Sequence, residues 1–588
     1  MKHYIFLLTV IALTFSCNGR KSGVYNDGYV AYAPTSLTPE EKEMVVKAIA
    51  PLHERYEPEF KMLATDIRAW NYHTDALSGH FHEVRGSFSY AVALLDLGDP
   101  QYRQRAFDII EKTVSLQDVD PNSKSCGVWP YYEEEQLATK KSPIDYNWAD
   151  FNAVSLLDIY MGHRDELPPA LLEKVENALI LAGKSVQKRN CGPGYTNIAI
   201  MGTYVTWMVS RLFDLPEMQE YAAKRLKTFY EYTLEKNGFS EYNSPTYTIV
   251  ALDELERMRR HIVEPEAKAM IEELYAVAWG IIARHYHRPS GQWAGPHSRS
   301  YSTLIRPSFY GLLFEASGGK IDMGVRPSRS DAKIKHQIPA SILPLFLKPV
   351  YPRVERDVFE NREPQIVGTT YLTQSYALSS ANRSSLWNQR RPFLVYWGTQ
   401  QPHYLQVRLL HDFYDLSTAM YFSEQRDSTV LSVVNFATDG GDKHINIDII
   451  KEGKFTAKDL RLRFEFGAVS ADELPPLPQH DYAPICFILD GLPFSLQLFY
   501  SVFGSYKGCW KKGGDETCAW LDYVIYSGDE TEIDLAHTDA AALGFAFGVG
   551  NMSEEAAACT VKNGLLSAAW KGLKVNAPVK PDKKPANY

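Results

Sequence analysis

The stretch GPHSRSY, residues 295–301, brings a histidine, an arginine and a tyrosine close together in the chain. His297 and Tyr301 have side chains that can transfer a proton, and the planar guanidinium of Arg299 pairs well with a carboxylate or a sulfate. We therefore predict that His297 transfers a proton, that Arg299 binds an acidic substrate group and that Tyr301 assists. The competing interpretation is a Gly-Pro turn entering a helix, with polar residues that only cap it.

Four earlier passages also run from a Gly-, Pro- or Asx-rich stretch directly into a helical pattern. They are SGHFHEVRGSFSYAVALLDL, SPIDYNWADFNAVSLLDIYM, CGPGYTNIAIMGTYVTWMVSRLF and EYNSPTYTIVALDELERM. The later passages are spaced by about fifty residues, the length of two helices with their loops. Each unit is therefore predicted to be a helical hairpin, and stacked hairpins form an open solenoid or a closed ring.

In a closed ring the inner helices would all begin at one rim, where residues far apart in the sequence would meet. Helix capping needs only Ser, Thr, Asn or Asp, so it does not explain the histidines, arginines and tyrosines found there. The predicted catalytic residues are His82, Asn197, Tyr247 and His297. The predicted substrate-binding residues are His80, Arg85, Asn147, Trp148, Asp150, Tyr242, Trp293, Arg299 and Tyr301.

A polar stretch in the second half of the chain adds two further candidates. Gln389 and Arg390 lie between strand-like runs, and a loop there would reach over the rim to bind substrate. The alternative is that this stretch only forms a contact between domains.

The predicted rim residues fit an acidic carbohydrate. Aromatic side chains stack on sugar rings, and arginine favours a carboxylate or sulfate. Uronic acid glycans are cleaved by β-elimination: a base removes the C5 proton, the carboxylate is neutralised, and an acid protonates the leaving O4. Tyrosine and histidine would share the proton transfers while asparagine and arginine stabilise the developing charge. No cofactor is predicted, since the sequence has no Cys/His metal spacing, and a structural divalent cation stays open.

The motifs YTN, residues 195–197, and EYNSPTY, residues 241–247, resemble those of the toroid-plus-sandwich polysaccharide lyases, the heparinase II/III and alginate lyase group. The resemblance implies that Asn197 neutralises the substrate carboxylate and that Tyr247 is the acid or the base. Those lyases often have a histidine beside this asparagine, whereas Ile198 follows it here. That duty would fall to His82 or His297. The features also resemble polysaccharide lyase family 27, the rhamnose–glucuronate lyases.

Two other functions stay open at this point. An inverting glycoside hydrolase on the same ring would use paired carboxylates, for which Glu83, Asp150 and Glu241 are available. A surface glycan-binding lipoprotein without catalysis would keep the aromatic residues and arginines while losing the proton donors.

The elements that must position these residues change character along the 588-residue chain. Apolar residues recur at helical spacing in the first half, and short alternating runs between turns fill the second half. The predicted fold is therefore multidomain, α then β. It comprises an (α/α) toroid of helical hairpins at 38–330, a linker at 331–350, an antiparallel β-sandwich at 351–572 and a loose tail at 573–588.

The N-terminus predicts export. Residues 1–17 have a short basic start, an apolar run and then Cys17, a pattern typical of a bacterial lipoprotein signal, with a tether at 18–37. We expect lipid anchoring in the bacterial cell envelope, on the periplasmic side or at the outer-membrane surface. In that oxidising compartment Cys509 and Cys518 are predicted to pair across a hairpin.

The net charge of −9 argues against a nucleic-acid partner. The expected partner is an acidic polysaccharide or oligosaccharide, with membrane contact through the lipid alone. We expect a monomer or a dimer.

Overall fold

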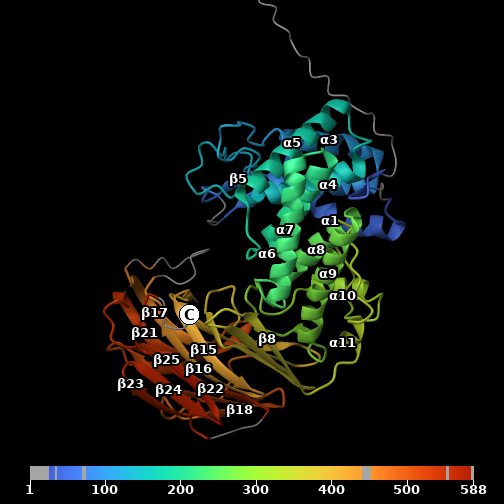
Figure 1. The fold of residues 1–588 in the computed structure, drawn as a ribbon. Helices are drawn as coiled ribbons and strands as arrows, with labels where there is room; N and C mark the ends of the chain where they lie inside the picture. Colours follow the sequence, from blue (N-terminus) through green and yellow to red (C-terminus); the bar gives the residue numbers. More distant parts are fainter. Residues whose placement is uncertain are drawn as a thin grey trace, which may run out of the picture.

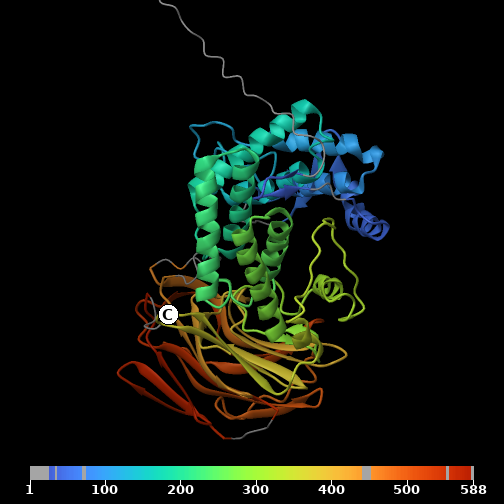
Figure 2. The ribbon, with the colours of Figure 1, turned by 45° about the vertical axis from the view of Figure 1, so that its right-hand side comes forward.

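The computed structural model describes residues 25–32, 36–68, 74–439, 450, 452–550 and 555–583. The predicted export signal and Cys17 lie outside these residues. Within them, no helix combines the length and apolar character needed to cross a membrane. The helical domain and the β domain lie one above the other in Figures 1 and 2.

Four helical hairpins, counted within the described residues, form most of the first domain. Their first helices pack side by side in chain order as an inner layer, and their second helices form an outer layer (Figure 1). The inner helices are α2 (Val84–Leu97), α4 (Asn147–His163), α6 (Thr196–Leu212) and α8 (Tyr247–His261). The outer helices are α3 (Pro100–Val114), α5 (Pro169–Arg189), α7 (Pro216–Glu235) and α9 (Pro265–His285).

The two layers differ in how their sequences are buried. Helix α6 is buried on all sides except at Arg211, which is typical of a helix enclosed by neighbours. Helix α5 instead buries one stripe that includes Val175, Leu179 and Ala182. Each outer helix begins at a proline, which lacks the N–H that a first turn leaves unpaired.

A buried charge network joins the first and last hairpins at the end of the ring away from the helix starts. The Lys333 ammonium lies 2.9 Å from Asp96 of α2, and Arg257 of α8 lies 2.8 Å from Asp331. The predicted linker therefore packs, in its first part, against the helices and closes the ring. Helices α10 (Pro307–Ala316) and α11 (Leu343–Leu347) flank this segment.

A helix and several short strands surround the hairpins. Helix α1 (Pro39–Arg55) begins with a capping box between Thr38 and Glu41 and leads into a small antiparallel sheet. That sheet contains β3 (Tyr56–Glu57), β4 (Met62–Ile67) and β5 (Gly79–Glu83), and β5 runs directly into α2. The remaining short pairs are β1 (Tyr25–Asn26) with β2 (Ala31–Tyr32), and β6 (Tyr286–His287) with β7 (Gln292–Trp293).

The second domain contains two large antiparallel sheets and one small sheet. As described, the first sheet has the order β20 (Cys509–Gly514), β21 (Cys518–Asp534), β17 (Lys454–Gly467), β13 (His403–His411), β12 (Phe393–Trp397), β10 (Tyr376–Ala381), β9 (Ile366–Leu372) and β8 (Arg353–Glu360), with β14 (Tyr414–Asp415) paired to β13. The second has the order β11 (Arg383–Ser385), β15 (Ala419–Arg426), β16 (Thr429–Phe436), β22 (Ala541–Val549), β19 (Leu492–Phe503) and β18 (Ile485–Leu489).

Aromatic side chains fill the space between the two large sheets. Phe393 and Phe464 from one sheet meet Phe545 from the other edge to face, with ring centroids 6.0 and 5.1 Å apart. Burying each such ring stabilises the fold by about 1.5–3 kcal/mol. The predicted order of a helical toroid followed by an antiparallel sandwich is confirmed.

Two details of the predicted β domain are wrong. Residues from 573 were predicted to be loose, but β25 (Leu573–Pro578) forms a third sheet with β24 (Leu565–Trp570) and β23 (Ala558–Lys562). This sheet packs on the second large sheet, where Ala577 is buried. Cys509 and Cys518 are free thiols, since Cys509 pairs with Val524 across the hairpin.

Candidate functional site

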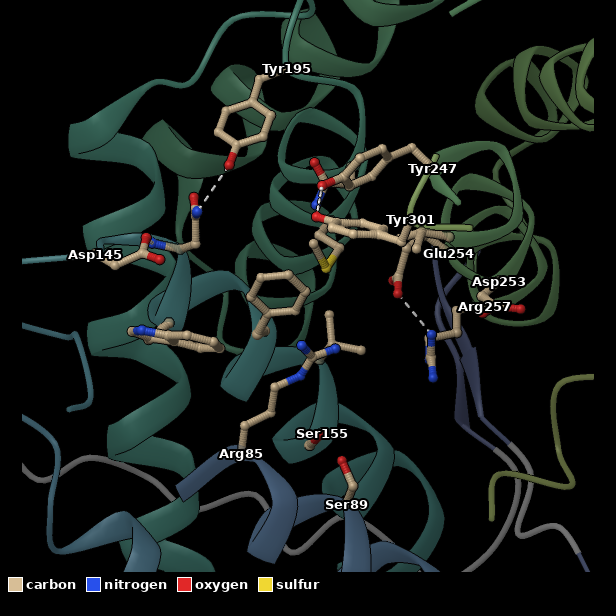
Figure 3. Close-up of a pocket in the computed structure, with 17 residues that line it drawn as sticks. Arg85, Ser89, Asp145, Ser155, Tyr195, Tyr247, Asp253, Glu254, Arg257 and Tyr301 are labelled. Atoms are coloured by element: carbon tan, nitrogen blue, oxygen red, sulfur yellow. Dashed lines mark hydrogen bonds and ion pairs between the residues drawn. The ribbon is translucent and has the colours of Figure 1, made fainter. Parts of the chain in front are cut away.

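A pocket of about 390 Å³ opens between the inner helices (Figure 3). All four inner helices line it, so the inner layer curves around this space. The structure brings six of the predicted residues together here: Arg85, Asn147, Trp148, Asn197, Tyr247 and Tyr301. Those on inner helices occupy the first or second helical position. Side chains of a helix tilt toward its N-terminus, so these residues overhang the mouth of the ring.

Tyr247 is the most closely held proton-transfer group of the pocket. Its hydroxyl oxygen accepts a hydrogen bond from Arg299 Nη2 at 2.9 Å and lies 3.0 Å from the Tyr301 hydroxyl. Burial raises the pKa of Tyr247 above its ordinary value, and the Arg299 charge opposes that rise. Tyr247 is therefore protonated at neutral pH and suited to act as an acid.

The guanidinium of Arg299 bonds to other side chains of the protein. Its guanidinium bonds to Glu241 at 3.1 Å and to Gln389 at 2.8 Å, and it lies over the Trp387 ring. It does not line the pocket. The structure therefore does not place Arg299, which was predicted to bind the substrate carboxylate, in the pocket lining; its donors bond to Tyr247, Glu241 and Gln389.

Arg85 is the pocket cation that is open to an acidic ligand. It extends into the pocket with its guanidinium 3.9 Å from the centre of the Phe151 ring (Figure 3). Among the described residues, no carboxylate lies within ion-pair distance of it, whereas Arg257 is paired with Glu254, Asp158 and Asp331. The surrounding protein desolvates Arg85 and lowers its pKa. It still carries its charge at neutral pH.

The amide of Asn197 faces the same pocket. Its Oδ1 is buried and has no hydrogen-bond partner within the described part of the chain, so this residue does not cap α6. Asn147 is held instead by two contacts: Arg189 donates to its Oδ1 at 2.6 Å, and its Nδ2 donates to the Tyr195 hydroxyl at 3.1 Å. The capping interpretation fails for Asn197, whose Oδ1 can accept a hydrogen bond and whose Nδ2 can donate one to a ligand.

The predicted histidines do not reach the pocket. His297 is buried against the β domain, where its Nδ1 donates to the Asn243 carbonyl oxygen at 2.7 Å. Burial lowers its pKa to about 3, so it stays neutral at physiological pH. His80 and His82 lie on β5 and bond to carboxylates outside the pocket. The structure therefore does not place in the pocket the histidines predicted to transfer protons, His297 and His82, or His80, which was predicted to bind substrate.

Five more of the predicted substrate-binding residues do not line the pocket, and three of them are Trp293, Tyr242 and Asp150. Trp293 donates to Asn243 Oδ1 at 2.6 Å, and Tyr242 stacks on Phe359 at 3.9 Å. Asp150 is buried next to Gly202 between α4 and α6, and burial raises its pKa to about 7. For these three, packing within the protein replaces the predicted contact with substrate.

The stretch that contains Gln389 and Arg390 lies at a contact between the domains. Backbone hydrogen bonds join Ser300 to Gln389 at 2.7 Å and His297 to Arg391 at 3.0 and 2.9 Å. Residues 297–300 therefore run beside residues 389–391 of the β domain and bond to their backbone, as an added strand would. The inter-domain alternative fits Gln389, which bonds to Ser300 through its backbone and to Arg299 through its side chain.

The sequence analysis missed several polar residues of the pocket. They are Ser89, Asp145, Ser155, Tyr195, Asp253 and Glu254. Glu254 pairs with Arg257 at 2.8 Å, and burial raises its pKa to about 7. Most of these residues lie one or two turns inside a helix, whereas only helix starts were considered. Tyr195 could have been predicted from the sequence, because it is the first residue of the YTN motif. The carboxylates considered for a hydrolase, Glu83, Asp150 and Glu241, do not line the pocket.

Comparisons with known proteins give the following matches. A family model described as a domain of unknown function (DUF8769) matches residues 42–323, and no curated protein matches. A heparan sulfate lyase HepC mutant from Pedobacter heparinus aligns at 10% identity and TM-score 0.39, over 93% of this chain and 90% of that chain. Heparinase III aligns at 9% identity and TM-score 0.42, over 84% and 82%. Paenibacillus xanthan lyase aligns at 8% identity and TM-score 0.38, over 92% and 61%.

Proposed function

We propose that the protein is a polysaccharide lyase that cleaves a bond to a uronic acid by β-elimination in this pocket. The observation that carries the proposal is the Tyr247 hydroxyl, which bonds to Arg299 and Tyr301 in a pocket that also holds Arg85, a residue without a carboxylate partner in the described part of the chain. The pocket thus contains an acid (Tyr247), a group that binds an anion (Arg85) and an amide that can donate a hydrogen bond (Asn197).

In the proposed reaction the uronate carboxylate binds Arg85 and the Asn197 amide. Both donate to its oxygens as negative charge moves from C5 onto the carboxylate. Their effect grows as the reaction proceeds, because the enolate-like state carries more charge on those oxygens than the substrate does.

Glu254 is the proposed base. Its pKa of about 7 lies close to neutral pH, where a general base is most effective. Its Oε2 is buried without a hydrogen-bond partner among the described residues, and the residue lines the pocket. Glu254 takes the C5 proton, and the electron pair of that bond forms the C4–C5 double bond.

Tyr247 is the proposed acid. It gives its proton to O4 as the C4–O4 bond breaks, and Arg299 stabilises the phenolate that remains. Tyr301, a residue that is 49% exposed, passes a proton from water back to Tyr247 after each turnover. Glu254 releases the C5 proton to water, so that both residues are restored without a cofactor.

An inverting glycoside hydrolase is the second candidate. The presence of Glu254 with Asp145 and Asp253 in the pocket favours it, because a hydrolase needs an acid and a base of this kind. Incubation with a panel of uronic acid glycans separates the two reactions. A lyase produces an ultraviolet-absorbing unsaturated sugar, whereas a hydrolase produces reducing ends without that absorbance. Cleavage only without unsaturation would contradict the proposal, and so would binding without cleavage.

Rhamnose-linked glucuronate is the first substrate that we propose for this panel. The support is the sequence resemblance to family 27. We also propose lipid anchoring in the cell envelope, supported by the export pattern at residues 1–17. Labelling with a radioactive fatty acid, lost on Cys17→Ser, tests the anchor.

A further inference from the structure

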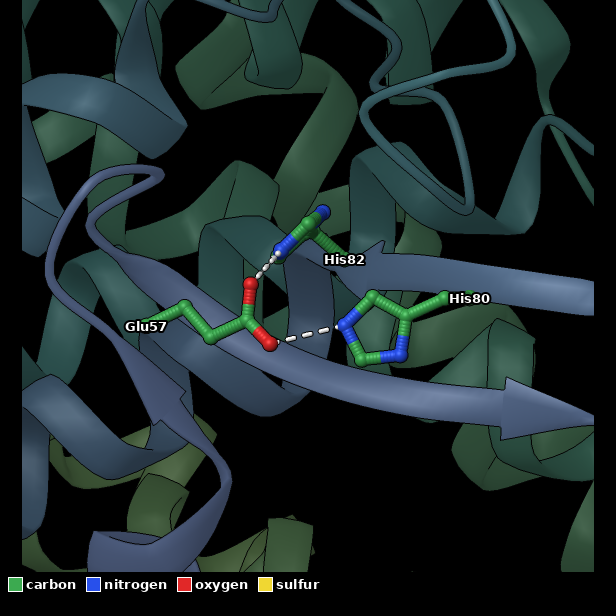
Figure 4. A group of neighbouring side chains, drawn as sticks. All are labelled: Glu57, His80 and His82. Atoms are coloured by element: carbon green, nitrogen blue, oxygen red, sulfur yellow. Dashed lines mark hydrogen bonds and ion pairs between the residues drawn. The ribbon is translucent and has the colours of Figure 1, made fainter.

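Two histidines and a glutamate converge beside the small sheet that precedes α2 (Figure 4). His80 and His82 are two positions apart on β5, so their side chains point to the same face. The Nε2 atoms of His80 and His82 lie 2.7 and 3.0 Å from the two carboxylate oxygens of Glu57 on β3. One donor atom from each of the three residues lies within 4.8 Å of the others.

Each histidine ring is also held at its other nitrogen by a carboxylate. His80 Nδ1 lies 2.8 Å from Asp66 on β4, and His82 Nδ1 lies 2.5 Å from Glu134. The Phe60 ring stacks on His82 at 3.9 Å and prevents the ring from turning. A carboxylate on the far nitrogen is the usual way in which proteins orient a metal-binding histidine.

Each of the two histidine rings faces a carboxylate oxygen at both of its nitrogens, and a neutral ring cannot donate to both. A neutral imidazole has one N–H, and here that N–H is used on Asp66 or Glu134. The Nε2 lone pair of each ring then faces a carboxylate oxygen of Glu57, an acceptor against an acceptor. Either one more proton on each ring or one cation between the three side chains removes this conflict.

We propose that Glu57, His80 and His82 bind a divalent first-row transition metal ion, with zinc as the best match. Imidazole and carboxylate are ligands that zinc accepts, with bonds of about 2.0–2.2 Å. The 2.7 and 3.0 Å contacts would then open to about 3.3 Å around the ion, a small displacement of two rings. Glu57 and His80 are partly exposed, which leaves the ion a path in and a place for water as a further ligand.

This ion would stabilise the wall of the pocket. Glu134 belongs to the segment between α3 and α4, and His82 also donates to it through its backbone N–H at 3.1 Å. In the same segment Tyr131 packs against Trp148, a pocket residue, with ring centroids 4.8 Å apart. The metal would thus tie β3 and β5 to this segment. The inference does not depend on the proposed reaction.

Calorimetric titration of Zn²⁺ into the metal-stripped full chain at pH 7.5 tests the site. We expect one equivalent to bind with a Kd of about 1 μM or tighter. Glu57→Gln and His82→Ala should each weaken binding at least about 100-fold, and Asp66→Asn about tenfold. His537→Ala is the matched control, because His537 also bonds to a carboxylate, Asp534, but lies in the β domain.

A thermal melt with and without Zn²⁺ gives a second measurement. The ion should raise the melting temperature of the wild-type chain and of His537→Ala, and leave Glu57→Gln unchanged. Glu57→Gln keeps the size and shape of the side chain, so it serves if His82→Ala does not fold. Absence of one-equivalent binding to the wild-type chain would overturn the proposal, and so would Glu57→Gln binding as tightly as wild type. Doubly protonated rings would then explain the cluster.

Discussion

Two clusters of proton-transfer side chains lie near the starts of inner helices, and only one of them faces the pocket. The tyrosine cluster, Tyr247, Tyr301 and Arg299, lines or supports the pocket at the start of α8. The histidine cluster, Glu57, His80 and His82, lies on the strands before α2, and none of its three residues lines the pocket. The two clusters look alike in the sequence, since both precede or begin a helical pattern.

Whether a side chain reaches the pocket depends on whether its residue lies within the inner helix or on the strand before it. Arg85, the second residue of α2, lies in the pocket, whereas His82, on the strand before that helix, does not. A helical side chain of the first turn tilts toward the mouth of the ring, but strand side chains alternate between the two faces of their own sheet. A small error in the predicted start of this helix therefore decides whether a residue is placed in the pocket or on the strand before the helix.

Among the substitutions that test this comparison of the two clusters, the one at Glu254 is expected to change activity most. Glu254→Gln keeps the shape but cannot take up a proton, so turnover should fall by about 100-fold or more. In the wild-type chain kcat/KM should rise as pH increases through about 7, because the base must lose its proton. A pH profile of both chains checks this. A wild-type rise near pH 7 that survives in the variant would exclude Glu254 as the base.

The next effect is expected at Arg85. Arg85→Ala removes a charged hydrogen bond to the substrate carboxylate, so kcat/KM should fall by about 10–100-fold. Arg362→Ala, an exposed arginine in the β domain, is the control. With a carboxyl-reduced glycan the difference in binding between wild type and Arg85→Ala should disappear. Equal loss of binding for both glycans would show that Arg85 does not recognise the carboxylate.

A small effect is expected at His297. Because its pKa of about 3 keeps the ring neutral, His297→Gln should leave the pH profile unchanged. Its loss of turnover should stay far below the ~100-fold expected for a proton-transfer group. The variant should unfold more easily, by about 1–3 kcal/mol, because the buried hydrogen bond to Asn243 is disturbed. A shifted pH optimum would return His297 to the mechanism.

The smallest effect concerns stability alone. Burial raises the pKa of Asp150 to about 7 from an ordinary 3.8, so the folded chain keeps a proton that the unfolded chain has lost. This contribution makes stability fall as pH rises from about 4 to 7. Asp150→Asn should remove that fall and melt about 2 °C higher than wild type at pH 8. Equal melting temperatures at pH 5 and pH 8 for both chains would contradict it.

Much of the architecture follows from sequence periodicity. Helical spacing and alternating runs place the toroid and the sandwich correctly, because they record which faces are buried. The spacing of helix starts also predicted that Asn197 and Tyr247 lie close together, and both line one pocket. The role of Arg299 was not accessible in this way, since its partners Glu241 and Gln389 lie 58 and 90 positions away.

The histidines show the other limit of sequence reasoning. His297 has the same neighbours in the chain whether it faces substrate or the Asn243 carbonyl, and only inter-domain packing decides between them. The Glu57, His80 and His82 cluster was likewise invisible, because its spacing matches no Cys/His pattern and β4 brings the residues together.

The fate of the proton on C5 of the uronic acid tests the central claim most directly. A uronate glycan that carries deuterium at C5 is cleaved by the wild-type chain, and the products are followed by NMR and mass spectrometry. We expect the deuterium to be lost to solvent, with a double bond between C4 and C5 and a slower reaction than for the unlabelled glycan. A product that keeps its C5 deuterium and has gained water would contradict β-elimination.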